Sequence, residues 1–344
     1  MSAVEVAARP AGEILGWSRD TVEPALRAAV DTLPASLRRI AGYHLGWWDE
    51  RERPATADGG KALRPALVLL SADATGGAPA VAVPAAVAVE LVHNFSLLHD
   101  DVMDRDVERR HRPTAWTVFG TGPAILAGDA LLTLALDVLA TSGHPAGQQV
   151  MRALSTAVLD LLNGQNADLD FERRTDVDPP ECLRMAREKT GALTACACAA
   201  GAAFGGGTPE QVGLLRAFGE RLGLAFQHAD DLLGIWGDPA VTGKPAYSDL
   251  ASRKKSLPVV AALTSGTAAG RELSVLYRRE GSLSGGDLAR AAALVEAAGG
   301  RAWSQAEADA LLAGALDDLA AAAPAARAAA ELGVLARLAA HRDH

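Results

Sequence analysis

The sequence predicts an all-α protein, folded as one large helical domain over residues 1–344. It is rich in Ala and Leu, which favour helices, and aromatic residues make up only 4%. The alternation of apolar and polar residues that is typical of half-buried strands is not convincing anywhere. Glycines and prolines divide the apolar runs into helix-sized segments. These observations together favour a fold built from helices.

The first elements follow from helix start and stop signals. Asp20, with Glu23 three residues later, predicts a helix start, and Pro34 is expected to open the next helix. Residues 49–60 are a polar loop, and a helix then extends to the glycines at 76–77.

Two basic residues stand at the start of that helix. Lys61 and Arg64 are three residues apart and therefore share a face near the helix N-terminus. Helix N-termini favour anions, so a phosphate site is one interpretation. A basic, solvated helix end is the other.

The most informative stretch is 89–113, VELVHNFSLLHDDVMDRDVERRHRP, at the end of a helix that begins near Pro84. Asp100 and Asp104 are four residues apart and share a helix face, whereas Asp101 is turned about 100° away. Paired carboxylates suit Mg²⁺. The forked donors of the arginines that follow match phosphate oxygens, and these are Arg109, Arg110 and Arg112. A solvated acidic helix end before a basic loop is the alternative.

His93 lies two helical turns before Asp100 on the same face. It is interpreted either as part of this site or as a hydrogen-bonded core histidine.

Further helices are expected at 122–141 and 145–170, the second ending in GQNADLD. Asp178-Pro-Pro-Glu is an N-cap signature for a helix that continues through Lys189 and Thr190. Thr208-Pro209 opens another helix, which reaches a second acidic pair with a glutamine before it: Gln227, Asp230 and Asp231. The segment after it, GKPAYSDLASRKKSLP, holds Lys244, Asp249, Lys254 and Lys255.

The pair Asp317-Asp318 has no basic neighbours in sequence and is interpreted as surface charge. The chain from 319 onward is expected to be Ala-rich helix without chemistry of its own.

Composition excludes several classes of protein. A net charge of −9 argues against a general nucleic-acid binder. Three cysteines in apolar or isolated positions imply no disulfide framework, which fits a reducing, cytoplasmic location. No signal peptide is evident, and charges interrupt the apolar runs, so no membrane span is expected.

The sequence has two acidic helix ends, each with lysines or arginines nearby. This pattern favours a polyanionic ligand that metal ions bridge to the carboxylates. The sequence shows no nucleophile with an adjacent base, no P-loop and no dinucleotide fingerprint. Metal-assisted ionisation of an allylic diphosphate in an apolar cavity is the chemistry that remains.

Several motifs in order carry a family resemblance between Gly59 and Pro258: GGKALRP, HNFSLLHDDVMD followed by RR, GQNAD, KTGAL, FQHADD and GKPAYSDL. With these motifs the chain resembles the trans-isoprenyl diphosphate synthases, the farnesyl and geranylgeranyl diphosphate synthase family. The resemblance implies a helical fold of the isoprenoid synthase type around a central cavity, with C-terminal helices over 259–344, and a homodimer.

The resemblance also implies residue roles. The diphosphate of isopentenyl diphosphate would be bound by Lys61, Arg64, His93 and Arg110. The allylic prenyl diphosphate would be held by Arg109, Lys189, Lys244 and Lys254. Three Mg²⁺ ions would be bound mainly by Asp100, Asp104 and Asp230, supported by Asp101, Asp168, Asp231 and Asp249. Thr190 and Gln227 would line the place where the allylic cation forms.

One position departs from the family pattern. The second motif of the family is DDxxD, but here it reads DDLLG, with Gly234 in the last place. Activity is expected to survive, because the first aspartate carries most of the metal contact in the family. Restoring an aspartate at 234 is expected to lower the Mg²⁺ requirement, provided that the backbone tolerates a side chain.

The residues before the first acidic motif bear on product length. Phe95, with Ser96 after it, resembles the pattern of archaeal geranylgeranyl diphosphate synthases, which predicts a C20 product. A C15 product, farnesyl diphosphate, is the second candidate, and ordinary core packing of Phe95 is the other interpretation.

Two further alternatives are a terpene cyclase and a non-catalytic partner subunit. A cyclase should carry a downstream Asn/Asp-x-x-Ser/Thr-x-x-x-Glu motif, which is not found in the expected region. A non-catalytic subunit should have lost the first acidic motif, which is intact.

Overall fold

A computed structural model of the protein describes residues 8–55, 62–239 and 245–341, and in these residues the predicted all-α architecture is confirmed. The chain forms two compact units, each assembled from separate segments. Unit 1 comprises Met1–Thr156, Cys196–Arg216 and Leu319–Leu335, and unit 2 comprises Ala157–Ala195, Ala217–Asp318 and Ala336–His344. That residues 1–344 act as one domain stays a prediction.

The elements of the first half are α1 (Ala11–Val30), α2 (Ala35–His44), α3 (Leu63–Ala74), η1 (Pro79–Ala82), α4 (Val83–Met103), β1 (Glu108–Arg109), β2 (Arg112–Pro113), α5 (Ala115–Phe119), α6 (Thr121–Thr141) and α7 (Gly147–Phe171). Those of the second half are α8 (Pro179–Ala186), η2 (Arg187–Gly191), α9 (Ala192–Phe204), α10 (Pro209–Trp236), α12 (Ser248–Ala251), α13 (Leu257–Thr264), α14 (Ala268–Tyr277), α15 (Gly285–Ala297), α16 (Gly300–Ala321) and α17 (Ala326–Ala340).

Most expected helix boundaries are confirmed to within a few residues. Pro34 caps α2, Pro84 lies in the first turn of α4, and Asp178 forms a complete capping box with Glu181 at the start of α8. The predicted start at Asp20 is wrong, because α1 already begins at Ala11. Glu23 pairs with Arg27 along the polar face of that helix, so its spacing from Asp20 reflects helical periodicity and marks no boundary.

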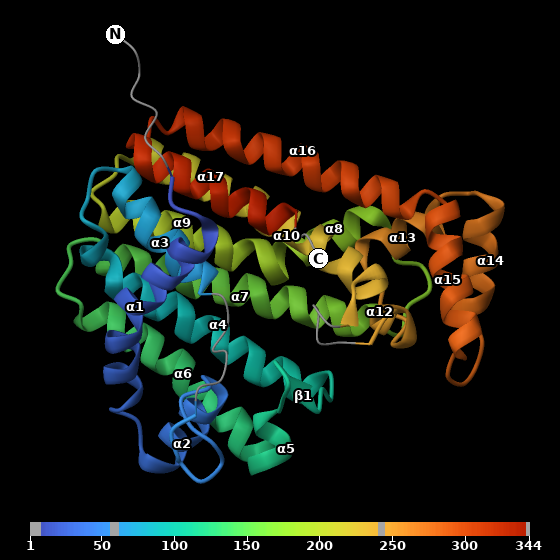
Figure 1. Ribbon diagram of the computed structural model, residues 1–344, viewed down its shortest axis with the longest axis horizontal. Helices are drawn as coiled ribbons and strands as arrows, with labels where there is room; N and C mark the ends of the chain where they lie inside the picture. Colours follow the sequence, from blue (N-terminus) through green and yellow to red (C-terminus); the bar gives the residue numbers. More distant parts are fainter. Residues whose placement is uncertain (1–7, 56–61, 240–244, 342–344) are drawn as a thin grey trace. The chain divides into compact units, whose positions relative to one another are not determined.

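In unit 1, helix α4 is the central element and packs against α6, α3 and α1 (Figure 1). Nearly every residue from Ala85 to Phe95 is buried, so the helix is covered on all sides until it reaches its acidic end. This burial fixes the direction in which the acidic end leaves the core.

Within the part of the chain that the structure describes, two helices are long and apolar enough to cross a membrane by length and composition alone, Pro79–Met103 and Thr121–Thr141. The apolar runs are therefore longer than the sequence analysis expected. In the first helix, 72% of the most apolar window is buried in the protein, and in the second 39%. One or two such helices are weak support for a span, since core helices of soluble proteins meet the same criterion.

In unit 2, α13 packs against α8, α14 and α15. One apolar cluster joins α8 to α13 and α10 through Cys182, Met185, Leu257 and Leu224. Between α8 and α9 the chain forms one π-helical turn, η2, over Arg187–Gly191. Single π turns inside helices often occur at functional sites, and this one contains Lys189 and Thr190.

A short antiparallel hairpin, β1–β2, follows α4 and was not expected from the sequence. Its two-residue strands are too short to show an alternating pattern, which is why sequence periodicity did not predict them.

Candidate active site

The predicted site residues fall into two sets, one in each unit, and each set is described by itself. The set of unit 1 is built on the C-terminal end of α4. Asp104 directly follows the helix, and its N–H still donates to the carbonyl of Asp100 at 2.8 Å. The backbone is therefore helical through both residues, and their carboxylates project from one face as predicted.

Asp101 differs from the other two aspartates of the motif, Asp100 and Asp104, because its side chain is buried, at 1% exposure. Arg109 donates through Nε to its Oδ1 at 2.6 Å. Burial raises the pKa of Asp101 to about 6, although the Arg109 guanidinium acts in the opposite direction. The first motif thus contains two carboxylates at its surface and one internal carboxylate that fixes Arg109.

Arg64, in the first turn of α3, lies beside His93 of α4. The distance between Arg64 Nη1 and His93 Nε2 is 3.4 Å. Burial, together with the positive charges of Arg64 and Arg110, lowers the pKa of His93 well below its usual value. A neutral imidazole can accept from the guanidinium and donate through its other nitrogen. Arg64 and His93 are therefore neighbours, and Arg110 is close enough for its charge to affect His93. Lys61 lies outside the described residues.

Phe95 and Ser96 are both buried, at 3% and 8% exposure. The Phe95 ring makes an edge-to-face contact with the ring of His99 at 4.8 Å. Both rings lie against Gly128 of α6, where an added β-carbon would be 2.4 Å from the His99 ring and 3.5 Å from Phe95. The glycine therefore permits the close approach that fixes the Phe95 ring between α4 and α6.

In unit 2, glycines allow three helical segments to approach closely. A β-carbon at Gly164 of α7 would lie 2.4 Å from the backbone nitrogen of Lys189 in η2. One at Gly223 of α10 would lie 2.8 Å from the Cα of Gly191. The π turn is thus packed directly against α7 and α10.

This packing pairs side chains across the three segments. Lys189 Nζ lies 2.6 Å from Oδ2 of Asp168, which follows Gly164 by one turn on α7. The Thr190 hydroxyl donates to Oε1 of Gln227 at 2.6 Å, and Gln227 Nε2 donates to Oδ1 of Asp231 at 2.8 Å. Thr190 and Gln227 therefore belong to one hydrogen-bonded chain that ends at Asp231, and Lys189 forms a separate ion pair with Asp168.

Asp231 is the internal carboxylate of the second motif, at 2% exposure. Its Oδ2 accepts from the backbone N–H of Leu257, the first residue of α13, at 2.9 Å, where the helix dipole favours an anion. Burial raises the pKa of Asp231 to about 6. Its neighbour Asp230 is exposed, so this motif also combines an internal carboxylate with an outer one.

Lys254 lies among the acidic groups of this set, with Nζ 3.7 Å from Asp231 Oδ1. Burial alone would lower its pKa, but four carboxylates outweigh burial and raise it well above the usual value: Asp231, Asp249, Asp168 and Asp230. Lys254 is therefore a permanent cation. Lys244 lies outside the described residues.

The structure also explains the unusual glycine of the second motif. A β-carbon at Gly234 would lie 2.4–2.6 Å from the carboxylate atoms of Asp249. Asp249 therefore occupies the space that a side chain at 234 would need.

Some polar residues near these sets were not singled out from the sequence. Gln165 of α7, one turn before Asp168, is 3% exposed, and its amide makes no hydrogen bond within the described chain. On α4, Asn94 donates to the side chain of the buried Glu90 at 2.9 Å. The GQNAD motif was a signal for Gln165, whereas an isolated Glu or Asn in an apolar helix gives none.

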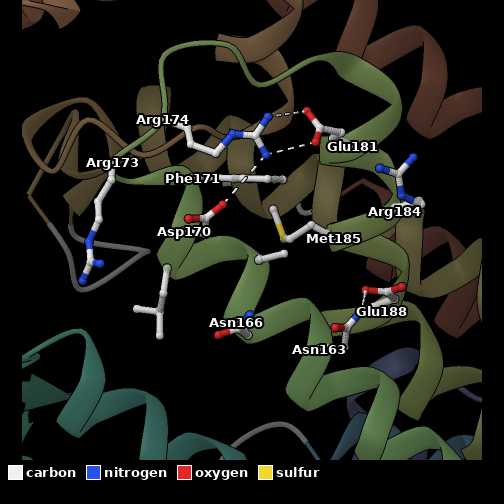
Figure 2. Close-up of a pocket in the computed structure, with 12 residues that line it drawn as sticks. Asn163, Asn166, Asp170, Phe171, Arg173, Arg174, Glu181, Arg184, Met185 and Glu188 are labelled. Carbon is white, nitrogen blue, oxygen red and sulfur yellow. Dashed lines mark hydrogen bonds and ion pairs between the residues drawn. The ribbon is translucent and has the colours of Figure 1, made fainter.

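A cavity of about 500 Å³ lies in unit 2 between the C-terminal part of α7 and α8, and none of the predicted catalytic residues lines it (Figure 2). Arg174 donates to both carboxylate oxygens of Glu181 at 3.0 Å and lies 3.8 Å from Asp170. Asn163 donates to Glu188 at 2.8 Å. These acidic groups are thus paired with Arg174 or Asn163, and Arg173 and Arg184 also line the cavity.

The outer carboxylates of the two sets are the groups available to a metal ion. Among the described residues, no group of three or more His, Cys, Asp or Glu side chains is arranged to hold a metal ion by itself. Each set instead offers one or two outer carboxylates. This fits Mg²⁺, which is commonly held by one or two carboxylates, waters and the phosphates of a substrate.

Comparison with known proteins gives consistent likenesses. A model of the polyprenyl synthetase family matches residues 50–295. The (2E,6E)-farnesyl diphosphate synthase of Mycobacterium tuberculosis is 51% identical over 298 residues, covering 86% of this chain and 83% of that enzyme. The geranylgeranyl diphosphate synthase of the same organism is 47% identical over 288 residues, covering 83% and 82%. The crystal structure of a polyprenyl synthetase from Streptomyces coelicolor matches with a TM-score of 0.91 at 48% identity, covering 95% of this chain and 98% of that one.

Proposed function

The chain belongs to the polyprenyl synthetase family and is a prenyltransferase of the trans-isoprenyl diphosphate synthase type, and we propose that it makes geranylgeranyl diphosphate. Its substrates are isopentenyl diphosphate and an allylic prenyl diphosphate. The C–O bond of the allylic diphosphate breaks, its carbon bonds to the double bond of isopentenyl diphosphate, and a proton then leaves.

One observation carries the proposal. In each unit an apolar helix carries two adjacent aspartates near its C-terminal end, one outer and one internal, and a cation lies beside the internal one. In unit 1 Asp101 fixes Arg109, and in unit 2 Asp231 lies beside Lys254. Such an arrangement suits a diphosphate accompanied by metal ions.

Mg²⁺, when bound, would neutralise the diphosphate leaving group. Asp100, Asp104 and Asp230 would hold the ions. Arg109, Lys189 and Lys254 would bind the allylic diphosphate, and Arg64, His93 and Arg110 the diphosphate of isopentenyl diphosphate. Thr190 and Gln227 would line the place where the allylic cation forms, with their hydrogen bond keeping both side chains in fixed rotamers.

The C20 product is supported by the buried Phe95 ring, five residues before Asp100, together with the small Ser96. A C15 product is the second candidate, favoured by the higher identity to the farnesyl enzyme than to the geranylgeranyl enzyme of M. tuberculosis, 51% against 47%.

The test is product formation by the purified full chain with both diphosphates. Products are dephosphorylated and separated by chromatography, with and without Mg²⁺. A Mg²⁺-dependent C20 alcohol is expected. A C15 alcohol as the end product would show that the product is farnesyl diphosphate. Absence of any prenyl product from folded protein would contradict the proposed prenyl transfer.

The homodimer is also a proposal. It is supported by exposed apolar side chains on α6, where Leu126 is 58% and Ile125 37% exposed. In sedimentation experiments the wild type is expected to behave as a dimer and Leu126→Glu as a folded monomer. A monomeric wild type would contradict the proposed homodimer.

A further inference from the structure

The hairpin that follows α4 contains an unfavourable turn. Arg109 pairs with Arg112 across the two strands, and the turn between them consists of Arg110 and His111. Both have left-handed backbone angles, with φ of 52° and 59°. For residues other than glycine this conformation is sterically unfavourable, because the β-carbon approaches the following carbonyl oxygen. Such a turn persists only where surrounding contacts determine it.

Those contacts come largely from residues 43–48, which we call the α2 end. Arg112 donates through Nη1 to the carbonyl of Tyr43 at 3.1 Å and through Nη2 to the carbonyl of Trp48 at 3.0 Å. Its guanidinium also lies over the Tyr43 ring, 4.4 Å from the centroid. Tyr43 is in the last turn of α2, where carbonyls need partners and the helix dipole favours a cation.

Two further features fix this contact. The Tyr43 hydroxyl donates to the carbonyl of Pro113 at 2.8 Å, on the strand opposite Arg109. The indole of Trp48 packs directly on Gly42, where an added β-carbon would be 2.0–2.5 Å from ring atoms. The absence of a side chain at Gly42 therefore sets the position of the Trp48 backbone that accepts from Arg112.

The three arginines of this segment, Arg109, Arg110 and Arg112, thus differ in their roles. Arg109 is bound to Asp101, and Arg112 is bound to the α2 end. We propose that Arg112 and Tyr43 are positioning residues, which hold the hairpin in its left-handed turn so that Arg110 can bind the diphosphate of isopentenyl diphosphate. Arg112 itself binds no diphosphate. This inference rests on the proposed function only for the role of Arg110.

The first experiment needs no ligand. Hydrogen exchange of the hairpin amides is measured in the full chain for the wild type, Arg112→Lys, Tyr43→Phe and Arg110→Ala. Lysine keeps the charge but lacks the planar fork that reaches two carbonyls. Faster exchange than in the wild type is expected in Arg112→Lys and in Tyr43→Phe.

The second experiment measures affinity for isopentenyl diphosphate by calorimetry, with KM and kcat alongside. Tyr43→Phe and Arg112→Lys should each weaken binding by about two- to tenfold, the equivalent of a lost hydrogen bond. The effect should appear in KM for isopentenyl diphosphate and leave kcat at saturation nearly unchanged.

The outcomes separate the two claims. If Arg110→Ala binds isopentenyl diphosphate as well as the wild type does, the proposed role of the hairpin in substrate binding is wrong. If Arg110→Ala loses affinity while Arg112→Lys and Tyr43→Phe keep wild-type exchange and affinity, the positioning role is overturned. Tyr43→Phe removes only one hydroxyl, so the test holds even if Arg112→Lys fails to fold.

Discussion

The carboxylate of Asp249 lies where a side chain on Gly234 would be, with 2.4 Å between its Oδ2 and an added β-carbon at 234. The second acidic motif therefore lacks an aspartate at a position whose side-chain space is filled by a carboxylate from a later segment. This relationship changes what a restored family motif would do.

Gly234→Asp is expected to displace Asp249 and to place two carboxylates side by side, which repel each other. The Mg²⁺ concentration for half-maximal rate should rise several-fold. The double variant Gly234→Asp/Asp249→Ala, which removes the clash, should return it toward the wild-type value. A lower Mg²⁺ requirement in the folded single variant would support the simpler expectation from the sequence.

Asp100→Ala and Asp104→Ala should each lower kcat by several orders of magnitude, because each removes an outer carboxylate of the proposed metal site. Asp317→Ala is the matched control, since Asp317 is an exposed carboxylate on α16. Initial rates at saturating Mg²⁺ and substrates decide the matter, and similar losses at Asp317 and Asp100 would contradict the site.

Arg110→Ala should chiefly raise KM for isopentenyl diphosphate, and Arg109→Ala chiefly KM for the allylic substrate. A charge-assisted hydrogen bond is worth about 1.5–3 kcal/mol, so tenfold or more is expected. Arg109→Ala should also lower the melting temperature, because it leaves the buried carboxylate of Asp101 without its cation. Equal changes of both KM values in each variant would argue against separate roles.

Product length should depend on the rings packed between α4 and α6. Phe95→Ala removes the proposed floor of the cavity and should lengthen the product beyond C20, whereas Ser96→Phe should shorten it toward C15. Chromatography of the dephosphorylated products measures both. Unchanged product length in two active variants would place the floor elsewhere.

The ion pair of Arg9 with Glu331 gives a pH-dependent contribution to stability away from the site. Arg9 Nη2 lies 2.6 Å from the fully buried Glu331 side chain. Burial by itself would raise the pKa of Glu331, but the Arg9 guanidinium outweighs it and lowers the pKa below 4.5. The folded state therefore prefers the ionised form, so this stabilisation is complete above about pH 4.5 and is lost as the pH falls through the lowered pKa.

Glu331→Gln should accordingly lower the free energy of unfolding by about 1.5–3 kcal/mol at neutral pH. The difference from the wild type should shrink at low pH, in urea unfolding curves recorded from pH 7 down to 3. A difference that stays constant with pH would show that the ion pair contributes nothing.

Much of the fold followed from the sequence. Local signals such as the prolines at 34, 84 and 179 and the capping box at Asp178 determine helix ends through backbone sterics and nearby hydrogen bonds, which act over a few residues. The helical spacing of Asp100 and Asp104 likewise needs no tertiary contact. The order of motifs indicated the family, and the comparisons confirmed both the family and the isoprenoid synthase type of fold.

The tertiary structure decided which of several similar side chains does what. Helical spacing separates Asp101 from Asp100, but it does not show that Asp101 is buried against Arg109 or that the α2 end binds Arg112. Likewise, the sequence alone suggests that Gly234 replaces a metal ligand, whereas the structure shows that the Asp249 carboxylate occupies the space of a side chain at 234. Such roles depend on contacts between residues far apart in the chain, because local spacing does not determine which groups burial desolvates or which partners they meet.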